Sequence, residues 1–288
     1  MRSTIFPPQR VTIVGIVNAT PDSFSDGGRF VEWSSGRERP RVEQAVEAAA
    51  VMLLDGAHIL DVGGESTRPG ALEVPADVET GRVVPVIEAL AKRFDVPISI
   101  DTRKAAVADE ALVAGATIVN DVSGLRFDPA LARSAARADA GLIVGHLRGV
   151  PETMQDEPHF DDVLTEVTDE LEASVQLARE AGIPDEHIAV DPGIGFGKRS
   201  FDNLALLARC GGIGKRLGLP VLVGPSRKGF LGTLTGDAVN DRDLATVAAC
   251  AVACFQGADA IRVHDAAGAR RAAVLGRALA SAREEGRA

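Results

Sequence analysis

A repeated pattern constrains the fold of this chain more than any other feature: a helical stretch, a glycine, and a short aliphatic run. In its clearest copy Val42, Val46, Ala49 and Leu53 fall on one helical stripe, Gly56 stands where a left-handed C-cap belongs, and 57–62 follows as a buried strand. Further copies begin at Gly115, Gly141, Gly182 and Gly257. The chain therefore predicts alternating helices and parallel strands.

Other aliphatic runs bring the number of predicted strands to eight, at 11–17, 57–62, 96–100, 116–119, 142–144, 188–190, 221–223 and 258–261. Polar residues stand at all eight strand ends, namely Asn18, Asp61, Asp101, Asn120, His146, Asp191, Ser226 to Lys228, and Arg262 to His264. Any one of them could merely cap the next helix. Together they favour a (β/α)₈ TIM barrel with one polar mouth over an open sheet, which concentrates its chemistry at one crossover.

The chain shows no linker, so residues 11–288 are predicted to form a single barrel domain behind an N-terminal extension, residues 1–10. The polar intervals 29–41 and 148–162 are expected to be loops. The N-terminus lacks the apolar region of a signal peptide, and no run of about 18 apolar residues suits a membrane span. A soluble, cytoplasmic protein is expected.

Charge and cysteine content argue against a nucleic-acid partner, a disulfide framework and a zinc site. The net charge of −10 argues against a nucleic-acid partner, which needs a basic surface. An anionic substrate must therefore meet a local basic cluster. The three cysteines include no Cys-x-x-Cys pair, so neither a disulfide framework nor a zinc site is expected. Cys250 and Cys254 share one helical face and are predicted to pack as small hydrophobes.

Such a basic cluster stands at the predicted strand ends and consists of Arg68, Arg227, Lys228, Arg262 and His264. Arg262 and His264 alternate on an extended chain, so their side chains point the same way. This arrangement suits a diphosphate, with Mg²⁺ bound mainly by phosphate and water oxygens. The alternative for Arg262 is a plain structural ion pair.

Hydrogen-bond acceptors gather at the same mouth. Asp101, Asn120 and Asp191 suit a heterocycle with several N–H donors, such as a 2-amino-4-oxo pyrimidine ring. A divalent metal held by Asp101 and Asp191 is the alternative, although no further oxygen ligands stand at metal-site spacing. No Ser-His-Asp or Cys-His arrangement suggests a covalent nucleophile.

These residues stand within motifs that resemble the dihydropteroate synthase family of pterin-binding enzymes. The resemblance spans nearly the whole chain from about Val11, through the segments 18–28, 61–70, 100–102, 120–124, 191–196, 226–228 and 262–265. It implies condensation of 6-hydroxymethyl-7,8-dihydropterin diphosphate with 4-aminobenzoate in folate biosynthesis. Members of the family are sulfonamide targets.

The resemblance also implies a role for each matching residue. The pterin ring would be held by Asp101, Asn120, Asp191 and Lys228, and the diphosphate by Asn18, Arg68, Arg262 and His264. Asn18 would in addition contact the Mg²⁺ that accompanies the diphosphate. The aminobenzoate pocket would consist of Phe24, Thr67, Pro69, Phe196 and Gly229. The residues expected to act in catalysis are Asp22, Phe24, Asp26, Arg68 and Lys228.

The implied reaction begins with cleavage of the C–O bond to diphosphate, which leaves a pterin methylene cation for the neutral arylamine to attack. Leaving-group neutralisation and alignment would be its main requirements. Two departures from the family pattern stand out. Gly229 replaces a residue that often carries a hydroxyl or a charge, so a backbone amide is expected to receive the aminobenzoate carboxylate. His146 lacks the methionines that commonly flank it, which is expected to alter packing under the pterin.

Two other functions remain open. A methyltetrahydrofolate–corrinoid methyltransferase would share Asp101, Asn120 and Asp191 but has no use for a diphosphate cluster. A catalytically silent pterin-binding barrel is the second alternative. The C-terminal helix, with Ala273, Leu275, Leu279 and Ala280 on one side, could cover the barrel or form a dimer face, and the resemblance favours a homodimer.

Overall fold

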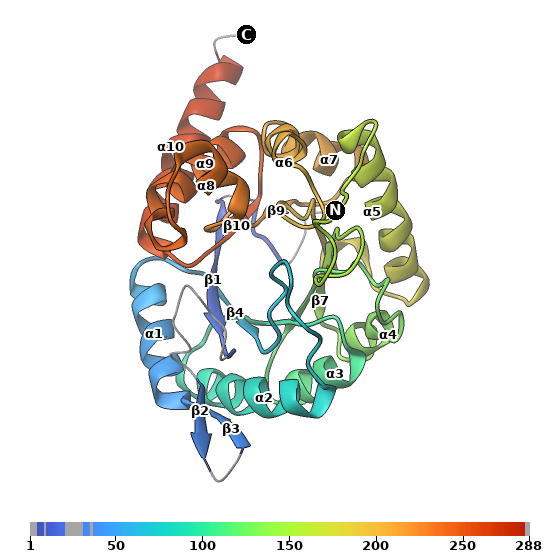
Figure 1. Cartoon of the computed structure of the whole chain (residues 1–288), viewed down its shortest axis with the longest axis vertical. Coiled ribbons are helices and arrows are strands. Elements are labelled where there is room, and N and C mark those ends of the chain that lie inside the picture. The colour runs from blue at the N-terminus through green and yellow to red at the C-terminus, as the bar shows by residue number, and fades with distance from the viewer. Residues whose placement is uncertain (1–4, 9, 21–30, 35–36, 286–288) are drawn as a thin grey trace.

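Eight parallel strands form the centre of the molecule and close into a barrel (Figure 1). The computed structural model describes residues 5–8, 10–20, 31–34 and 37–285. The strands run in the order β8-β7-β6-β5-β4-β1-β10-β9, and a parallel bridge between Val190 and Val221 joins the two edges. The barrel strands are β1 (Thr12–Asn18), β4 (Ile59–Gly63), β5 (Ile98–Asp101), β6 (Ile118–Asp121), β7 (Gly141–Gly145), β8 (Ile188–Asp191), β9 (Leu222–Val223) and β10 (Ala260–Val263). The predicted TIM barrel is confirmed.

Helices surround this barrel (Figure 1). They are α1 (Val42–Leu54), α2 (Ala76–Arg93), α3 (Ala105–Val113), α4 (Ala130–Arg137), α5 (Val163–Glu180), α6 (Ser200–Leu207), α7 (Cys210–Leu217), α8 (Gly229–Thr235), α9 (Asp243–Phe255) and α10 (Ala266–Glu285). Two short 3₁₀ turns lie at Asp185–His187 and Val239–Asp241. Because all eight strands are parallel, their carboxyl ends meet at one mouth.

Helix ends follow the local chemistry of the sequence. The Asp162 side chain caps α5 by accepting hydrogen bonds from the amides of Leu164 and Thr165. Gly56, predicted to end the first helix, has a φ of +108°, and a Cβ atom there would lie 2.6 Å from Cδ of Arg270. Only glycine meets both requirements without strain.

Two layers of apolar side chains build the core. Leu60, Val62 and Val119 belong to the larger layer between the strands and the helices. A smaller cluster contains alternate strand residues and two residues of the N-terminal extension, namely Ile5, Phe6, Val14, Ile59, Ile118, Ile143, Ala189, Leu222 and Ala260. Residues 5 and 6 therefore pack with the strands, while the domain boundary after residue 10 stays a prediction.

One of the two intervals expected to be loops contains strands, and the other does not. The interval 29–41, expected to be a loop, contains a hairpin of β2 (Val31–Ser34) and β3 (Arg37–Pro40), whereas 148–162 has neither helix nor strand. Cys250 and Cys254 are buried in α9 as predicted. In α10 Ala273 is buried, whereas Leu275 and Leu279 are 56% and 51% exposed. No helix in the described part of the chain is long and apolar enough to cross a membrane.

Candidate active site

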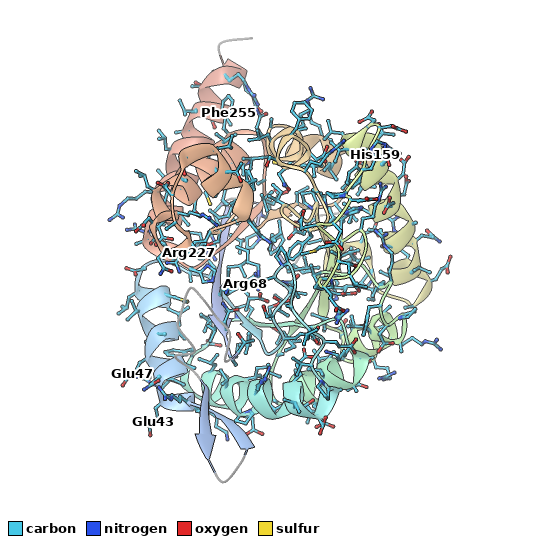
Figure 2. All side chains as sticks on the ribbon, in the orientation of Figure 1. Glu43, Glu47, Arg68, His159, Arg227 and Phe255 are labelled. Carbon is cyan, nitrogen blue, oxygen red and sulfur yellow. The ribbon has the colours of Figure 1, made fainter. Side chains whose placement is uncertain are left out.

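A cavity of about 770 Å³ opens beside the carboxyl ends of the strands. Many of the predicted site residues line it, namely Asn18, Thr67, Arg68, Pro69, Asp101, Phe196, Lys228, Gly229, Arg262 and His264. Figure 2 labels Arg68 near the centre of the ring of helices and Arg227 beside α8 and α9. The predicted residues Asp22, Phe24 and Asp26 lie outside the described residues.

Arg262 binds two carboxylates at the bottom of this cavity. Its Nε donates to Oδ2 of Asp61 and its Nη2 to Oδ2 of Asp101, both at 2.6 Å. Asn120 donates to the same Asp61 oxygen at 3.3 Å. The structural ion pair considered from the sequence is therefore present, although the Arg262 side chain still lines the cavity. Asp61 is fully buried and anchors the guanidinium from below.

Lys228 lies across the ring of Phe196, with Nζ 3.5 Å from the ring centroid. The stem of Lys228 fits there because residue 195 is glycine: a Cβ atom would lie 2.6 Å from Cδ of Lys228. Burial lowers the pKa of Lys228 to about 7 and raises that of Asp101 to about 7, with Arg262 opposing the second shift. Both groups can therefore change protonation near neutral pH.

Asn120 and Asp191 lie behind the residues that line the cavity. Oδ1 of Asp191 accepts a hydrogen bond of 2.7 Å from the amide of Gly193. Its Oδ2 lies 3.9 Å from the point that a Cβ atom on Gly224 would occupy, and Gly224 is part of the cavity wall. Burial raises the pKa of Asp191. Glycine at position 224 thus keeps the space between this carboxylate and the cavity open.

His264 lies between two polar side chains. Its Nδ1 lies 2.8 Å from Oγ of Ser226, and its Nε2 lies 3.3 Å from Nδ2 of Asn18. Burial and the nearby guanidinium of Arg227 lower the pKa of His264 to about 3. His264 is therefore a neutral hydrogen-bonding group here, while the cationic charge resides on the arginines and Lys228.

A buried ion-pair network holds the loop that carries Thr67 and Arg68. Arg103 donates to Oε1 of Glu65 through Nε at 3.0 Å and Nη2 at 2.7 Å. Lys104 bonds the other oxygen of Glu65 and also Oε2 of Glu79, at 2.6 Å for the second contact. This network was not predicted from the sequence, because ion pairs between distant segments leave no local pattern.

Lys198 was also missed, although it directly follows the glycine-rich segment 193–197. Its Nζ donates to the carbonyls of Gly193 and Phe196 at 2.9 Å and to that of His146 at 3.2 Å. It also lies 2.9 Å from Nδ1 of His146, and burial lowers its pKa to about 7. His146, a predicted mouth residue, is instead fully buried and joined to Glu170 at 3.1 Å.

The described residues contain no group of three or more His, Cys, Asp or Glu that could hold a metal ion. Asn18 lines the cavity and can offer one carboxamide oxygen. A single protein oxygen fits a Mg²⁺ ion that obtains its other ligands from a diphosphate and from water.

Comparisons with known proteins agree with this site. The family model for pterin-binding enzymes matches residues 14–264. A dihydropteroate synthase of Synechocystis is 45% identical over 258 residues, which cover 89% of this chain and 86% of that protein. The Yersinia pestis dihydropteroate synthase, solved as a sulfonamide complex, has a TM-score of 0.87 and 40% identity over 95% of both chains. The Burkholderia cenocepacia enzyme, solved with 7,8-dihydropteroate, has a TM-score of 0.81 and 39% identity over 96% of this chain and 94% of that one.

Proposed function

The chain belongs to the dihydropteroate synthase family of pterin-binding enzymes, and we propose that it joins 6-hydroxymethyl-7,8-dihydropterin diphosphate to 4-aminobenzoate for folate biosynthesis. One observation carries the proposal: Asp101, an acceptor for a pterin, and the cations for a diphosphate line a single cavity, and the carboxylate of Asp191 lies behind its Gly224 wall. A corrinoid methyltransferase would need the acceptors alone.

The pterin ring is proposed to enter beside Lys228 and Asp101. Asp101 and Asp191 would accept hydrogen bonds from the amino group and ring nitrogen, while Asn120 and Lys228 would bind the remaining polar edge. Nη2 of Arg262 donates to Oδ2 of Asp101 at 2.6 Å and so orients this carboxylate. The other oxygen of Asp101 could then accept a hydrogen bond from a donor on the pterin.

The diphosphate is proposed to bind at the other end, on Asn18, Arg68, Arg262 and His264. Asn18 would hold the accompanying Mg²⁺, which supplies further neutralisation of the leaving group. Arg68 and Arg262 would bind diphosphate oxygens as charge-assisted donors. Neutral His264 would contribute an N–H donor once its Nε2 exchanges the contact with Asn18 for one with a diphosphate oxygen.

Catalysis is proposed to depend on electrostatics and alignment. Cleavage of the C–O bond places its electron pair on the diphosphate, where Arg68 and Arg262 stabilise the developing charge. The arylamine then attacks the methylene cation and loses one proton. An arylamine is already unprotonated at neutral pH, so no strong general base is required. The side chains around the bound substrates would have to keep water from the cation.

The aminobenzoate ring is proposed to lie among Thr67, Pro69, Phe196 and Gly229, all of which line the cavity. Sulfonamides are proposed ligands of the same region, in keeping with the sulfonamide complex of the Yersinia enzyme. The roles of Asp22, Phe24 and Asp26 stay predictions, as do the homodimer and the cytoplasmic location.

The direct test incubates the purified protein with Mg²⁺ and both substrates and measures dihydropteroate and diphosphate by chromatography. Arg68→Ala and Arg262→Ala are compared with Arg137→Ala, whose side chain is 63% exposed on α4. We expect equal amounts of the two products, a large loss in both cavity variants, and no change in the control. Tight pterin binding without product would contradict the proposal and favour the silent barrel.

A further inference from the structure

Arg227 has a backbone conformation that arginine rarely adopts. Its φ is +53°, and among the described non-glycine residues only Leu125 and Asp139 also have a positive φ. In this region the Cβ atom of an L-residue crowds the following carbonyl oxygen. Arg227 lies between Ser226, which contacts His264, and Lys228, which extends over Phe196. The strained residue therefore connects two residues of the cavity wall.

Three sets of hydrogen bonds hold Arg227 from the start of α9. Its Nε and Nη2 donate to the two carboxylate oxygens of Asp243 at 2.7 and 2.8 Å. Its amide donates to Oγ1 of Thr246 at 3.0 Å. Its carbonyl accepts a bond of 3.3 Å from Nη1 of Arg242. The side chain, the amide and the carbonyl are thus all fixed by residues 242–246.

Burial and charge favour these contacts. Thr246 is 2% exposed, so its hydroxyl depends on a protein partner. The Arg227 side chain is 17% exposed and that of Asp243 38%. The hydrogen bond from Arg227 lowers the pKa of Asp243, so the carboxylate is charged at neutral pH. A bidentate pair of this kind fixes the plane of the guanidinium as well as its position.

We infer that Asp243 and Thr246 are positioning residues of the active site. They hold Arg227 in the left-handed conformation, and this conformation directs Lys228 toward Phe196 and Ser226 toward His264. A change of Arg227 to an ordinary negative φ would rotate the chain on either side and move both residues away from the cavity. The inference rests on the proposed function, because it assigns Lys228 to pterin binding.

Two substitutions separate the backbone role of Arg227 from a direct role of its guanidinium. Glycine adopts a positive φ without strain, whereas alanine does not. We therefore expect Arg227→Gly to retain a kcat/KM for the pterin diphosphate about tenfold higher than that of Arg227→Ala, the ratio that the left-handed preference implies. Calorimetric Kd values for the pterin should show the same order. Equal losses in the two variants would overturn the inference.

A double-mutant cycle then tests Asp243. In the wild-type background Asp243→Ala should lower kcat/KM about tenfold, and in the Arg227→Gly background about twofold or less. Asp243→Asn, which keeps an acceptor oxygen, should retain intermediate activity and serves if the alanine variant fails to fold. A lower Tm with unchanged kcat and KM in the Asp243 variants would show that the Arg227–Asp243 pair only stabilises the fold, and would overturn the inference.

Asp139 provides a matched control, because its φ is +51° and its side chain is 89% exposed. Asp139→Ala should change Tm but leave both KM values unchanged. If the wild-type protein makes no dihydropteroate, the proposed function fails by itself. The Arg227 and Asp243 variants are then still compared by pterin Kd, and an equal Kd in all of them would refute the positioning role.

Discussion

The buried network around Glu65 supports a quantitative prediction for Glu65→Gln. Its side chain is 5% exposed, and its two oxygens bind Arg103 and Lys104, which are 7% and 8% exposed. A carboxamide keeps the shape of this group but can accept through one oxygen only, so its NH₂ must face a cation. The substitution therefore removes one counter-charge from two buried cations.

The remaining contacts of Arg103 and Lys104 reduce the loss of unfolding free energy that we expect for Glu65→Gln. Removing one partner of a buried pair costs about 3–5 kcal/mol of unfolding free energy. Lys104 still has Glu79 at 2.6 Å, and Arg103 still has the carboxylate of Glu73 at 3.7 Å and the ring of Phe127 at 3.9 Å. We therefore expect the lower end, about 3 kcal/mol, which corresponds to a Tm decrease of roughly 6 °C in a chain of this size.

Urea unfolding measures the effect, with Asp109→Asn as the control. Asp109 pairs with Arg137 at 2.9 Å, but the two side chains are 47% and 63% exposed. Because exposed pairs contribute about 1 kcal/mol or less, the control should change little. Glu65→Gln should also raise the KM for 4-aminobenzoate, because Thr67 and Arg68 belong to the same loop. A stability loss equal to that of Asp109→Asn would refute the reasoning.

Three further predictions concern pH and metal. Burial lowers the pKa of Lys228 to about 7, so its cationic fraction declines above that pH. The kcat/KM for the pterin diphosphate should therefore fall as pH rises through 7. Lys228→Met should not show this decrease of kcat/KM with pH. Burial lowers the pKa of His146 from 6.5 to about 4, so the unfolded chain binds the extra proton between these values. Stability should therefore fall as pH decreases from 6.5 to 4, and a urea midpoint of His146→Gln that is equally acid-sensitive would contradict this account. Asn18→Ala should require a higher Mg²⁺ concentration for half-maximal activity, while its Kd for a pterin without diphosphate stays unchanged. Titrations of Asn18→Ala and of the wild-type protein with Mg²⁺ and with this pterin provide the check.

The sequence by itself determined the barrel and most of its mouth. Helical stripes, C-cap glycines such as Gly56 and aliphatic runs are local signals, because each depends on neighbouring residues along the chain. Parallel strands in a closed barrel must end at one mouth, so the sequence alone predicts that Asp101, Lys228, Arg262 and His264 meet there.

Only the tertiary structure decided how these groups are paired and held. The bonds from Arg262 to Asp61 and Asp101, the Glu65 network and the bonds between Arg227 and Asp243 join residues that are 16 to 201 positions apart in the chain. Neither spacing nor periodicity records such contacts, because they depend on which strand ends, loops and helix starts the tertiary fold brings together. Burial, and with it the lowered pKa of Lys228, likewise follows from packing: an identical lysine on an exposed helix would keep its ordinary pKa.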